Sequence, residues 1–146
     1  MNILPASALA LSALLLAASA HAADPKKAPG NKRLMDHSSA SLISAETAIQ
    51  VMDENIPEKA WKIIKGSQYV WVSQVEGGMS GTSCVVTARV MVLPLTATLN
   101  APLFRPKHTA TTFDAATNSS SDACKALAKA KLKEATMAVA SSVVKL

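Results

Sequence analysis

The sequence is poor in aromatic residues: it holds two Trp, one Tyr and two Phe. Proteins that bind single-stranded nucleic acid stack successive bases on aromatic side chains, so this composition makes a poor platform for that function. Long apolar runs are equally scarce, because residues 3–18 form one and no later run is long enough to span a membrane. The chain also has no internal repeat. These absences argue against a single-strand binder, a multi-span membrane protein and a repeat array.

The apolar run has the length of a signal peptide and is short for a membrane-spanning helix. Small residues at Ala18-Ser19-Ala20 and Ala20-His21-Ala22 offer two cleavage sites, and we favour cleavage after Ala22. No Lys or Arg precedes the run, so an uncleaved anchor is the alternative, and no cysteine follows either site to carry a lipid. We expect residues 1–22 to be a signal peptide and the protein to be periplasmic or secreted.

The remaining residues carry the whole formal net charge of +5 and suit one domain with a modest core. Their first part mixes lysine and arginine with Pro and Gly and has few apolar residues. We therefore expect residues 23–41 to be a flexible basic leader, which in most proteins is a solvated spacer. Residues 42–146 are then a single folded domain.

The two cysteines are Cys84 and Cys124. An even count in an exported chain predicts a disulfide, which here closes a loop of about 40 residues and stabilises the fold by roughly 4 kcal/mol. A redox pair is one alternative, but redox cysteines are usually close in sequence. A zinc site is the other, but it needs further ligands, and few histidines remain to supply them. We expect a structural disulfide, no metal and no cofactor.

The pattern of residues predicts a helix, three strands and a second helix. Ser44 is suited to cap the first helix, with Glu46 in its first turn, and Pro57 predicts a break in it and a second piece that ends at Gly66. Residues 69–75, 82–93 and 108–116 are rich in β-branched or aromatic residues and predict strands.

The segments between these strands are less clearly marked. The sequence EGGMSG predicts a hairpin loop, and residues 94–107 either extend the second strand or form a long connection. Residues 122–144 predict the last helix. The fold class is therefore α+β: a two-layer domain with an N-terminal helix broken near Pro57, a three-stranded antiparallel sheet and a C-terminal helix.

A disulfide to the last helix would orient the middle strand. If Cys84 points to the helices, strand alternation sends its neighbours Val85, Arg89 and Met91 to the other face. Aromatic residues of the preceding strand can join them, which gives a candidate contact face for a protein partner: Tyr69, Trp71, Val85, Arg89 and Met91. The alternative is that the segment LTATLNAPLF folds over this face.

Basic residues give a second candidate surface, suited to polyanions or to peripheral contact with an anionic membrane surface. They are Lys26, Lys27, Lys32 and Arg33 in the leader and Lys125, Lys129 and Lys133 in the last helix. The element order and the stretch SSSDACKALAK resemble double-stranded-RNA-binding domains. That family is intracellular, and its paired lysines and preceding glycine turn are missing here, so we expect no nucleic-acid partner.

No group of residues predicts an active site. Asp36, His37 and Ser38 are adjacent, but catalytic triads are assembled from separate segments. His108 follows a proline and a lysine at a strand start, and Glu76 has no evident carboxylate partner for acid–base catalysis. The Gly-rich turn after Glu76 is followed by a strand, whereas a phosphate-binding loop precedes a helix. We expect the protein not to be an enzyme.

The leader SALLLAASAHAADPKK, the two distant cysteines and the closing KALAKAKLKEA helix together resemble small exported proteins of unknown function from Burkholderia-like bacteria. The resemblance implies secretion and exposure to a host immune system, as an antigen would have, and it implies no catalytic residue. The sequence predicts a non-enzymatic interaction module of the cell envelope or secreted fraction. An electrostatic binder of anionic lipids or polyanions is the alternative. Nothing in the sequence indicates the partner or the oligomeric state.

Overall fold

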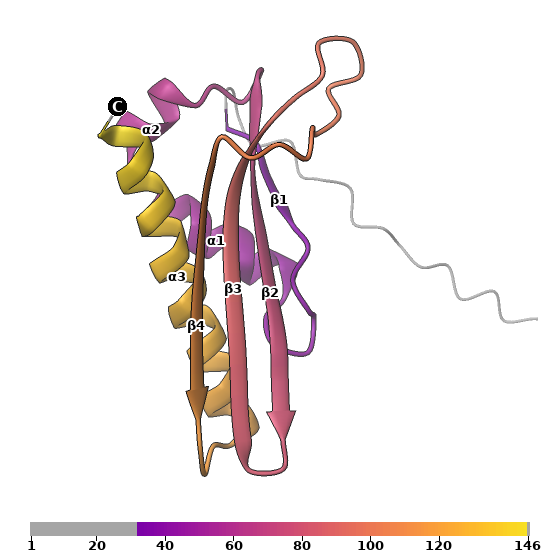
Figure 1. Ribbon diagram of the computed structural model, residues 1–146, viewed down its shortest axis with the longest axis vertical. Helices are drawn as coiled ribbons and strands as arrows, with labels where there is room; N and C mark the ends of the chain where they lie inside the picture. The colour runs from indigo at the N-terminus through magenta and orange to yellow at the C-terminus, as the bar shows by residue number, and fades with distance from the viewer. Residues whose placement is uncertain (1–31, 146) are drawn as a thin grey trace, which may run out of the picture.

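The computed structural model describes residues 32–145 and shows an α+β fold of two layers, a sheet and a set of helices (Figure 1). The elements follow one another as β1 (Leu34–Asp36), α1 (Ala45–Asn55), α2 (Glu58–Ile63), β2 (Tyr69–Ser80), β3 (Ser83–Pro94), β4 (His108–Ala116) and α3 (Ser121–Val144). The helices all lie on one side of the sheet. The expected α+β class is confirmed, whereas the expected signal peptide, residues 1–22, lies outside the described residues.

Local sequence signals set where the helices begin and end. The Ser44 hydroxyl accepts a hydrogen bond from the Thr47 backbone N–H at 3.2 Å and caps α1. Pro57 separates α1 from α2, so the predicted break is present, but α2 ends at Ile63 rather than at Gly66. Ser120 caps α3 in the same way as Ser44 caps α1, by accepting from the Ala123 N–H at 3.1 Å.

The sheet has four strands in the order β1-β2-β3-β4, and the expectation of three antiparallel strands is wrong in this detail. The extra strand, β1, pairs parallel to β2, with Met35 opposite Val72. It lies inside the stretch expected to be a flexible leader, so the ordered fold begins earlier than predicted. A three-residue strand has too short a pattern to be recognised in a sequence, and here its position depends on pairing with a distant segment.

β2 and β3 form a long hairpin whose turn is Gly81-Thr82. The stretch EGGMSG, expected to be a loop, is therefore mostly strand. Gly77 has a φ of +120°, and a Cβ there would collide with the Val85 carbonyl of β3. Glycine at this position lets the two strands stay paired, with Gly77 opposite Val86.

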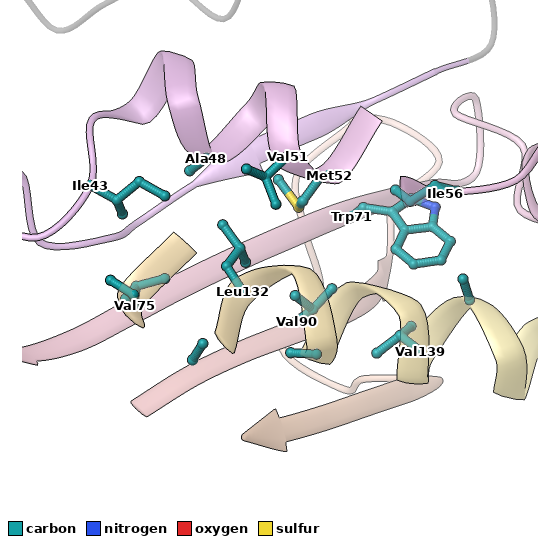
Figure 2. Close-up of a cluster of buried hydrophobic side chains, with 14 of the residues drawn as sticks. Ile43, Ala48, Val51, Met52, Ile56, Trp71, Val75, Val90, Leu132 and Val139 are labelled. Atoms are coloured by element: carbon teal, nitrogen blue, oxygen red, sulfur yellow. The ribbon is translucent and has the colours of Figure 1, made fainter. Parts of the chain in front are cut away.

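The main core lies between the sheet and the helices. Figure 2 shows side chains of α1 and α3, among them Met52, Leu132 and Val139, directed toward the sheet residues Trp71 and Val90. All five are almost completely buried. At roughly 1.5–3 kcal/mol for each large apolar side chain removed from water, this layer supplies most of the driving force for folding.

Residues 95–107 connect β3 to β4 and do not extend the strand. Leu95 and Pro102 form an isolated bridge, and the chain turns back between them. The Thr96 N–H donates to the Ala101 carbonyl at 2.9 Å, and the Asn100 N–H donates to the Thr96 carbonyl at 3.1 Å. This connection is therefore a compact, internally bonded loop, which projects at one end of the sheet (Figure 1).

Candidate functional site

The face of the sheet that carries no helix is the first candidate surface. Along β3, Cys84, Val86, Ala88, Val90 and Val92 belong to the main core, so the alternate residues point the opposite way. We call this opposite side the open face. Strand register places on it Gln74 and Glu76 of β2, Val85, Thr87, Arg89 and Met91 of β3, and Thr109, Thr111 and Phe113 of β4.

Two of the five predicted contact residues do not lie on the open face. Trp71 pairs with Val92, points to the helices and is fully buried. Its ring centroid lies 5.7 Å from that of Trp61, with the planes tilted by 55°. Tyr69 is half-buried against the same core. The prediction was wrong for Tyr69 and Trp71 because the register of β2 against β3 gives these residues the same side as Cys84.

One end of the open face is covered. Val70, Val72 and Leu93 form a second, smaller core there, against which Met35 of β1 and Leu95 of the β3–β4 loop pack. Met91, a predicted contact residue, is half-buried beside it. Of the LTATLNAPLF segment, the alternative cover for this face, only Leu95 packs against it, so the segment as a whole does not fold over the face.

The uncovered end presents apolar side chains to solvent. Phe113 is 63% exposed and Val85 is 38% exposed, and Phe113 lies directly opposite Thr87 in the register. Sequence reasoning selected Val85 and missed Phe113. Alternation along β4 could have found it, since the exposed residues of this strand are every second one: Thr109, Thr111, Phe113 and Ala115.

Both signs of charge are present on the open face. The Arg89 Nε donates to the Thr111 hydroxyl at 3.3 Å, and the Gln74 amide donates to the Glu76 carboxylate at 2.6 Å. Within residues 32–145, neither Arg89 nor Glu76 is in a salt bridge. The Arg89 guanidinium can therefore receive a carboxylate from outside.

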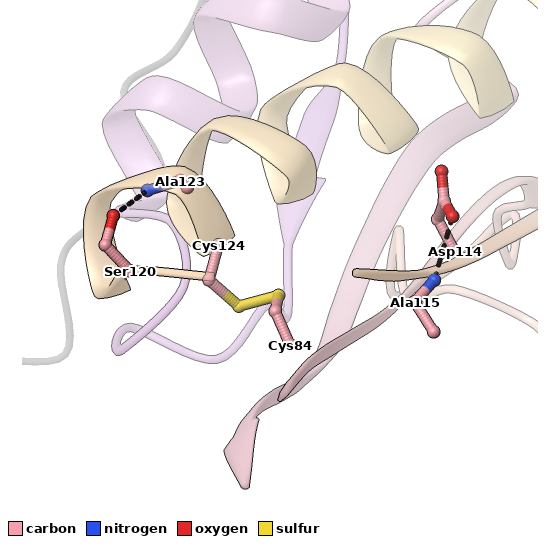
Figure 3. The surroundings of a disulfide bond; sticks show 6 residues. All are labelled: Cys84, Asp114, Ala115, Ser120, Ala123 and Cys124. Atoms are coloured by element: carbon pink, nitrogen blue, oxygen red, sulfur yellow. Dashed lines mark hydrogen bonds between the residues drawn. A yellow bond between two sulfur atoms is a disulfide. The ribbon is translucent and has the colours of Figure 1, made fainter. Parts of the chain in front are cut away.

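The predicted disulfide between Cys84 and Cys124 is confirmed (Figure 3). The Cα atoms are 5.6 Å apart, and the bond joins residues 40 positions apart in the sequence. It ties the first turn of α3 to the beginning of β3, at the end of the sheet opposite the β3–β4 loop. Both cysteines are buried and joined in this bond, so neither is a free thiol.

The residues predicted to contact polyanions differ in whether they already interact within the fold. Lys32 is engaged, because its Nζ lies 2.9 Å from the Asp53 carboxylate and 5.3 Å from the centre of the Trp61 ring. Arg33 donates to the Asn100 carbonyl of the β3–β4 loop at 3.1 Å. The remaining members in the described chain, Lys125, Lys129 and Lys133, are exposed along α3, whereas Lys26 and Lys27 lie outside the described residues.

A shallow groove between α1 and α3 passes beside two of these lysines. Lys129 and Lys133 border it together with Val51, Glu54 and Asn55. A carboxylate stands among the cations, and the lysines are on the surface. The groove therefore lacks the buried, purely basic lining that would hold a specific anion.

Asp36, adjacent to His37 and Ser38 in sequence, belongs to a different network. Its carboxylate accepts hydrogen bonds from the Ser38 and Ser73 hydroxyls, both at 2.6 Å, and from the Ser38 N–H at 3.2 Å. The Ser38 hydroxyl in turn accepts from the Val75 N–H at 3.0 Å. His37 is exposed and takes no part through its side chain. The network fastens β1 to β2.

His108 and Ser142 form the one His–Ser contact in the described chain, with Nδ1 and Oγ 3.0 Å apart. The single hydroxyl proton of Ser142 is donated to the Val139 carbonyl at 2.7 Å. The His108 Nδ1 must then donate to Ser142, so it cannot act as the base that would activate that hydroxyl. The pair links the start of β4 to the end of α3.

Lys131 connects α3 to the edge of the sheet. Its Nζ lies 2.8 Å from the Glu134 carboxylate and 3.2 Å from that of Asp114. The hydrogen bond from Lys131, helped by one from the Ala115 N–H, lowers the pKa of Asp114 below its ordinary value. The hydrogen bonds to Glu134 and then to Asp114 raise the pKa of Lys131. Both shifts belong to a surface ion pair that joins two elements of the fold.

Other kinds of site are not found in residues 32–145. No group of three or more His, Cys, Asp and Glu side chains there is placed to hold a metal ion. None of the helices in this range combines the length and apolar character needed to cross a bilayer.

The sequence matches no protein-family model, and no curated protein sequence matches it. Solved structures to which this chain is similar include two of the PelC dodecamer from Paraburkholderia phytofirmans. One has 12% identity and a TM-score of 0.44 over 75% of this chain and 88% of that one. The other has 11% identity and a TM-score of 0.42 over 75% and 87%.

A further similar structure is a protein of Caulobacter crescentus CB15 described as a lipoprotein, with 16% identity and a TM-score of 0.32 over 77% of this chain and 85% of that one. At these scores and identities the likenesses assign neither a family nor a function to this chain.

Proposed function

We propose that the protein is a non-enzymatic interaction module of the cell envelope or of the secreted fraction. It binds another protein through the uncovered end of the open face, which contains Val85, Thr87, Arg89 and Phe113. The remaining strands, helices and disulfide form the scaffold that holds this face in place.

The observation that carries the proposal is the exposure of Phe113 and Val85 on a regular sheet face. Adjacent strands fix these side chains at defined spacing, so the face is rigid before it binds anything. An aromatic ring that is 63% exposed retains most of its apolar surface for burial in a complex. Phe and Arg are both enriched at protein interfaces.

The polar groups of the face indicate the chemistry of the partner. Arg89 is exposed on the strand that also carries Val85, and its guanidinium faces solvent without a carboxylate. The favoured partner presents an apolar surface to Phe113 and Val85 and a carboxylate to Arg89, because a charge-assisted bond in a desolvated interface is stronger than a neutral one.

The location in the envelope is supported by the disulfide. Disulfides persist in oxidising compartments such as the periplasm and are rare in the cytosol. The non-enzymatic character is supported by the hydrogen bonds of the polar groups. The Asp36 carboxylate, the Ser142 hydroxyl and the Lys131 ammonium each hold two elements or two turns together.

The test is photo-crosslinking in the native host. Benzoylphenylalanine replaces Phe113 on the open face or, as a matched control, Ala138, which is exposed on α3. We expect a discrete adduct from position 113 and none from position 138. The adduct disappears when Arg89→Glu or Val85→Asp is added.

Equal adducts from both positions, or none from either, would overturn the proposal. Adducts that persist in Arg89→Glu and Val85→Asp would also overturn it, because the face would then not determine binding. An adduct with twice the mass of the chain would identify the partner as a second copy of the protein.

A further inference from the structure

The β3–β4 loop is compact, yet three of its large apolar side chains are exposed to solvent. Phe104 is 81% exposed, Leu99 is 80% exposed and Leu103 is 44% exposed. We call these three residues the apolar tip. Single exposed apolar residues are ordinary on protein surfaces, but three within six positions of one loop form a patch that needs an explanation.

The loop is held in this conformation by hydrogen bonds within it and to β3. Besides the bonds around the Thr96–Ala101 turn, the Leu103 N–H donates to the Pro94 carbonyl at 2.8 Å, and the Lys107 N–H donates to the Val92 carbonyl at 2.9 Å. Asn100 has a φ of +49°, a conformation that asparagine tolerates better than most residues. The exposed side chains therefore extend from a fixed loop.

The charge around the apolar tip is positive. The chain has no Asp or Glu between Glu76 and Asp114, a stretch that includes the whole loop. Arg105 and Lys107 directly follow Phe104 and are exposed. Arg33 adds a third cation from another segment, because its guanidinium bonds the Asn100 carbonyl inside the loop.

The neighbouring connection between α2 and β2 has the same character. The Leu95 N–H donates to the Gln68 carbonyl at 2.8 Å, which places this connection beside the loop. It carries exposed Lys65, and the end of α2 just before it carries exposed Lys62 and the 44% exposed Ile63. No acid occurs between Glu58 and Glu76. Apolar and basic residues thus gather at the end of the sheet opposite the disulfide.

We propose that the apolar tip inserts into the surface of an anionic lipid bilayer. Leu and Phe side chains surrounded by Lys and Arg are the combination that binds such a surface, since the apolar groups enter the headgroup region and the cations attract anionic lipids. A soluble polyanion would use the cations and leave the apolar groups in water. Of these two, only the bilayer uses both kinds of group.

This arrangement leaves the open face free for a partner. The loop follows the last residue of β3, Pro94, whereas Val85 is near the beginning of that strand. At about 3.3 Å per residue the two are separated by roughly 30 Å. Membrane contact through the loop and protein contact through the open face are therefore independent of each other.

Fluorescence tests the insertion directly. Phe104→Trp reports on the loop, and Phe113→Trp is the matched control on the open face. The native Trp61 and Trp71 are buried, so their emission is subtracted using the unsubstituted protein. The full chain, in the form that its host produces, is mixed with vesicles of phosphatidylglycerol and phosphatidylcholine or of phosphatidylcholine alone.

We expect a blue shift of Phe104→Trp emission with the anionic vesicles, little shift with the neutral ones and none for Phe113→Trp. The double variant Leu99→Ser/Phe104→Ser should sediment with anionic vesicles about tenfold less than the unsubstituted protein, because most of the inserted apolar surface is gone. Added salt should weaken the binding that remains.

Absence of a shift in Phe104→Trp, or an equal shift in both Trp variants, would overturn the proposal. Unchanged binding of the double variant would overturn it too, since another segment would then hold the protein on the vesicle. The tip would bind protein instead if the protein bound no vesicles and the double variant lost the protein crosslink made from position 113. The vesicle results do not depend on whether the open face binds a partner.

Discussion

The two faces of the sheet are built from the same strands and have opposite environments. On β3, Val86 and Val90 point to the helices and are completely buried, whereas Val85, next in the chain to Val86, is 38% exposed. On β4, the fully exposed side of the strand carries Phe113, and the side toward α3 carries Thr112, whose hydroxyl donates to the Lys131 carbonyl at 2.9 Å. Residue type alone does not distinguish these environments.

The difference comes from what covers each face. The three helices pack on one face, while the other is covered at one end by Met35 and Leu95. Residues on the helix side therefore contribute to stability, and those at the uncovered end remain available for binding. The predictions that follow test this division in order of decreasing effect on the free energy of unfolding.

The largest difference should appear between Trp71→Ala and Phe113→Ala. Trp71 is fully buried against Trp61 and the helices, so we expect its truncation to lower the free energy of unfolding by about 3–5 kcal/mol. Phe113 is mostly in water already, and its truncation should change stability by no more than about 0.5 kcal/mol. Urea denaturation followed by circular dichroism measures both.

A comparable loss in the two variants would mean that the open face is covered in the native protein, for example by a second copy. Repeating the denaturation at several protein concentrations separates these cases, because the stability of an oligomer depends on concentration and that of a monomer does not. Trp71→Phe serves as the conservative control on the helix side, since it retains an aromatic ring in the core.

The disulfide fixes the end of the helix layer farthest from the β3–β4 loop. The double variant Cys84→Ser/Cys124→Ser should lower the free energy of unfolding by about 2–4 kcal/mol, since the closed loop of 40 residues no longer restricts the unfolded chain. The measurement is the urea midpoint of the variant against that of the oxidised protein.

A matched control is the native protein with its disulfide reduced by dithiothreitol, which leaves two thiols in place of the two hydroxyls. Equal stability of all three forms would show that the bond does not constrain the unfolded chain. A loss confined to the serine variant would point to the cost of burying hydroxyl groups and not to the bond.

The sequence alone was sufficient to predict which way β3 faces. Cys84 is bonded to a helix, so it must point to the helix layer, and alternation then orients every other residue of the strand. The same reasoning failed for β2, because no residue of that strand is tied to a known partner. Its register depends on where the hairpin turns, at Gly81-Thr82, whereas the prediction made all of residues 76–81 a loop. A shift of one residue exchanges the two faces, so the side of the sheet that Trp71 occupies could not be assigned without the position of the turn.

Features that depend on contacts between distant segments were also beyond the sequence pattern. β1 is held by pairing with β2 and by the bond of Ser73 to Asp36, residues 37 positions apart. The apolar tip arises because the β3–β4 loop folds back on itself, which leaves Leu99 and Phe104 outside. In the sequence these residues are indistinguishable from core residues of a strand.

The smallest predicted effect concerns the rim between the two faces, where Lys131 of α3 binds Asp114 of β4. The pKa of Asp114 is lowered, so its stabilising contribution is complete above the ordinary carboxyl pKa and is lost as the pH falls below about 4. The pKa of Lys131 is raised, so its contribution is present below its ordinary pKa and is lost as the pH rises above about 10.

Lys131→Met should therefore move the Asp114 pKa back up toward its ordinary value in a carboxyl NMR titration. Lys129→Met, an exposed neighbour on the same helix, should leave that pKa unchanged. Because both partners are accessible to solvent, the effect on stability should be small and should decrease with added salt. If the two lysine variants gave the same Asp114 titration, the charge of α3 as a whole, and not this one contact between helix and sheet, would set the carboxyl pKa.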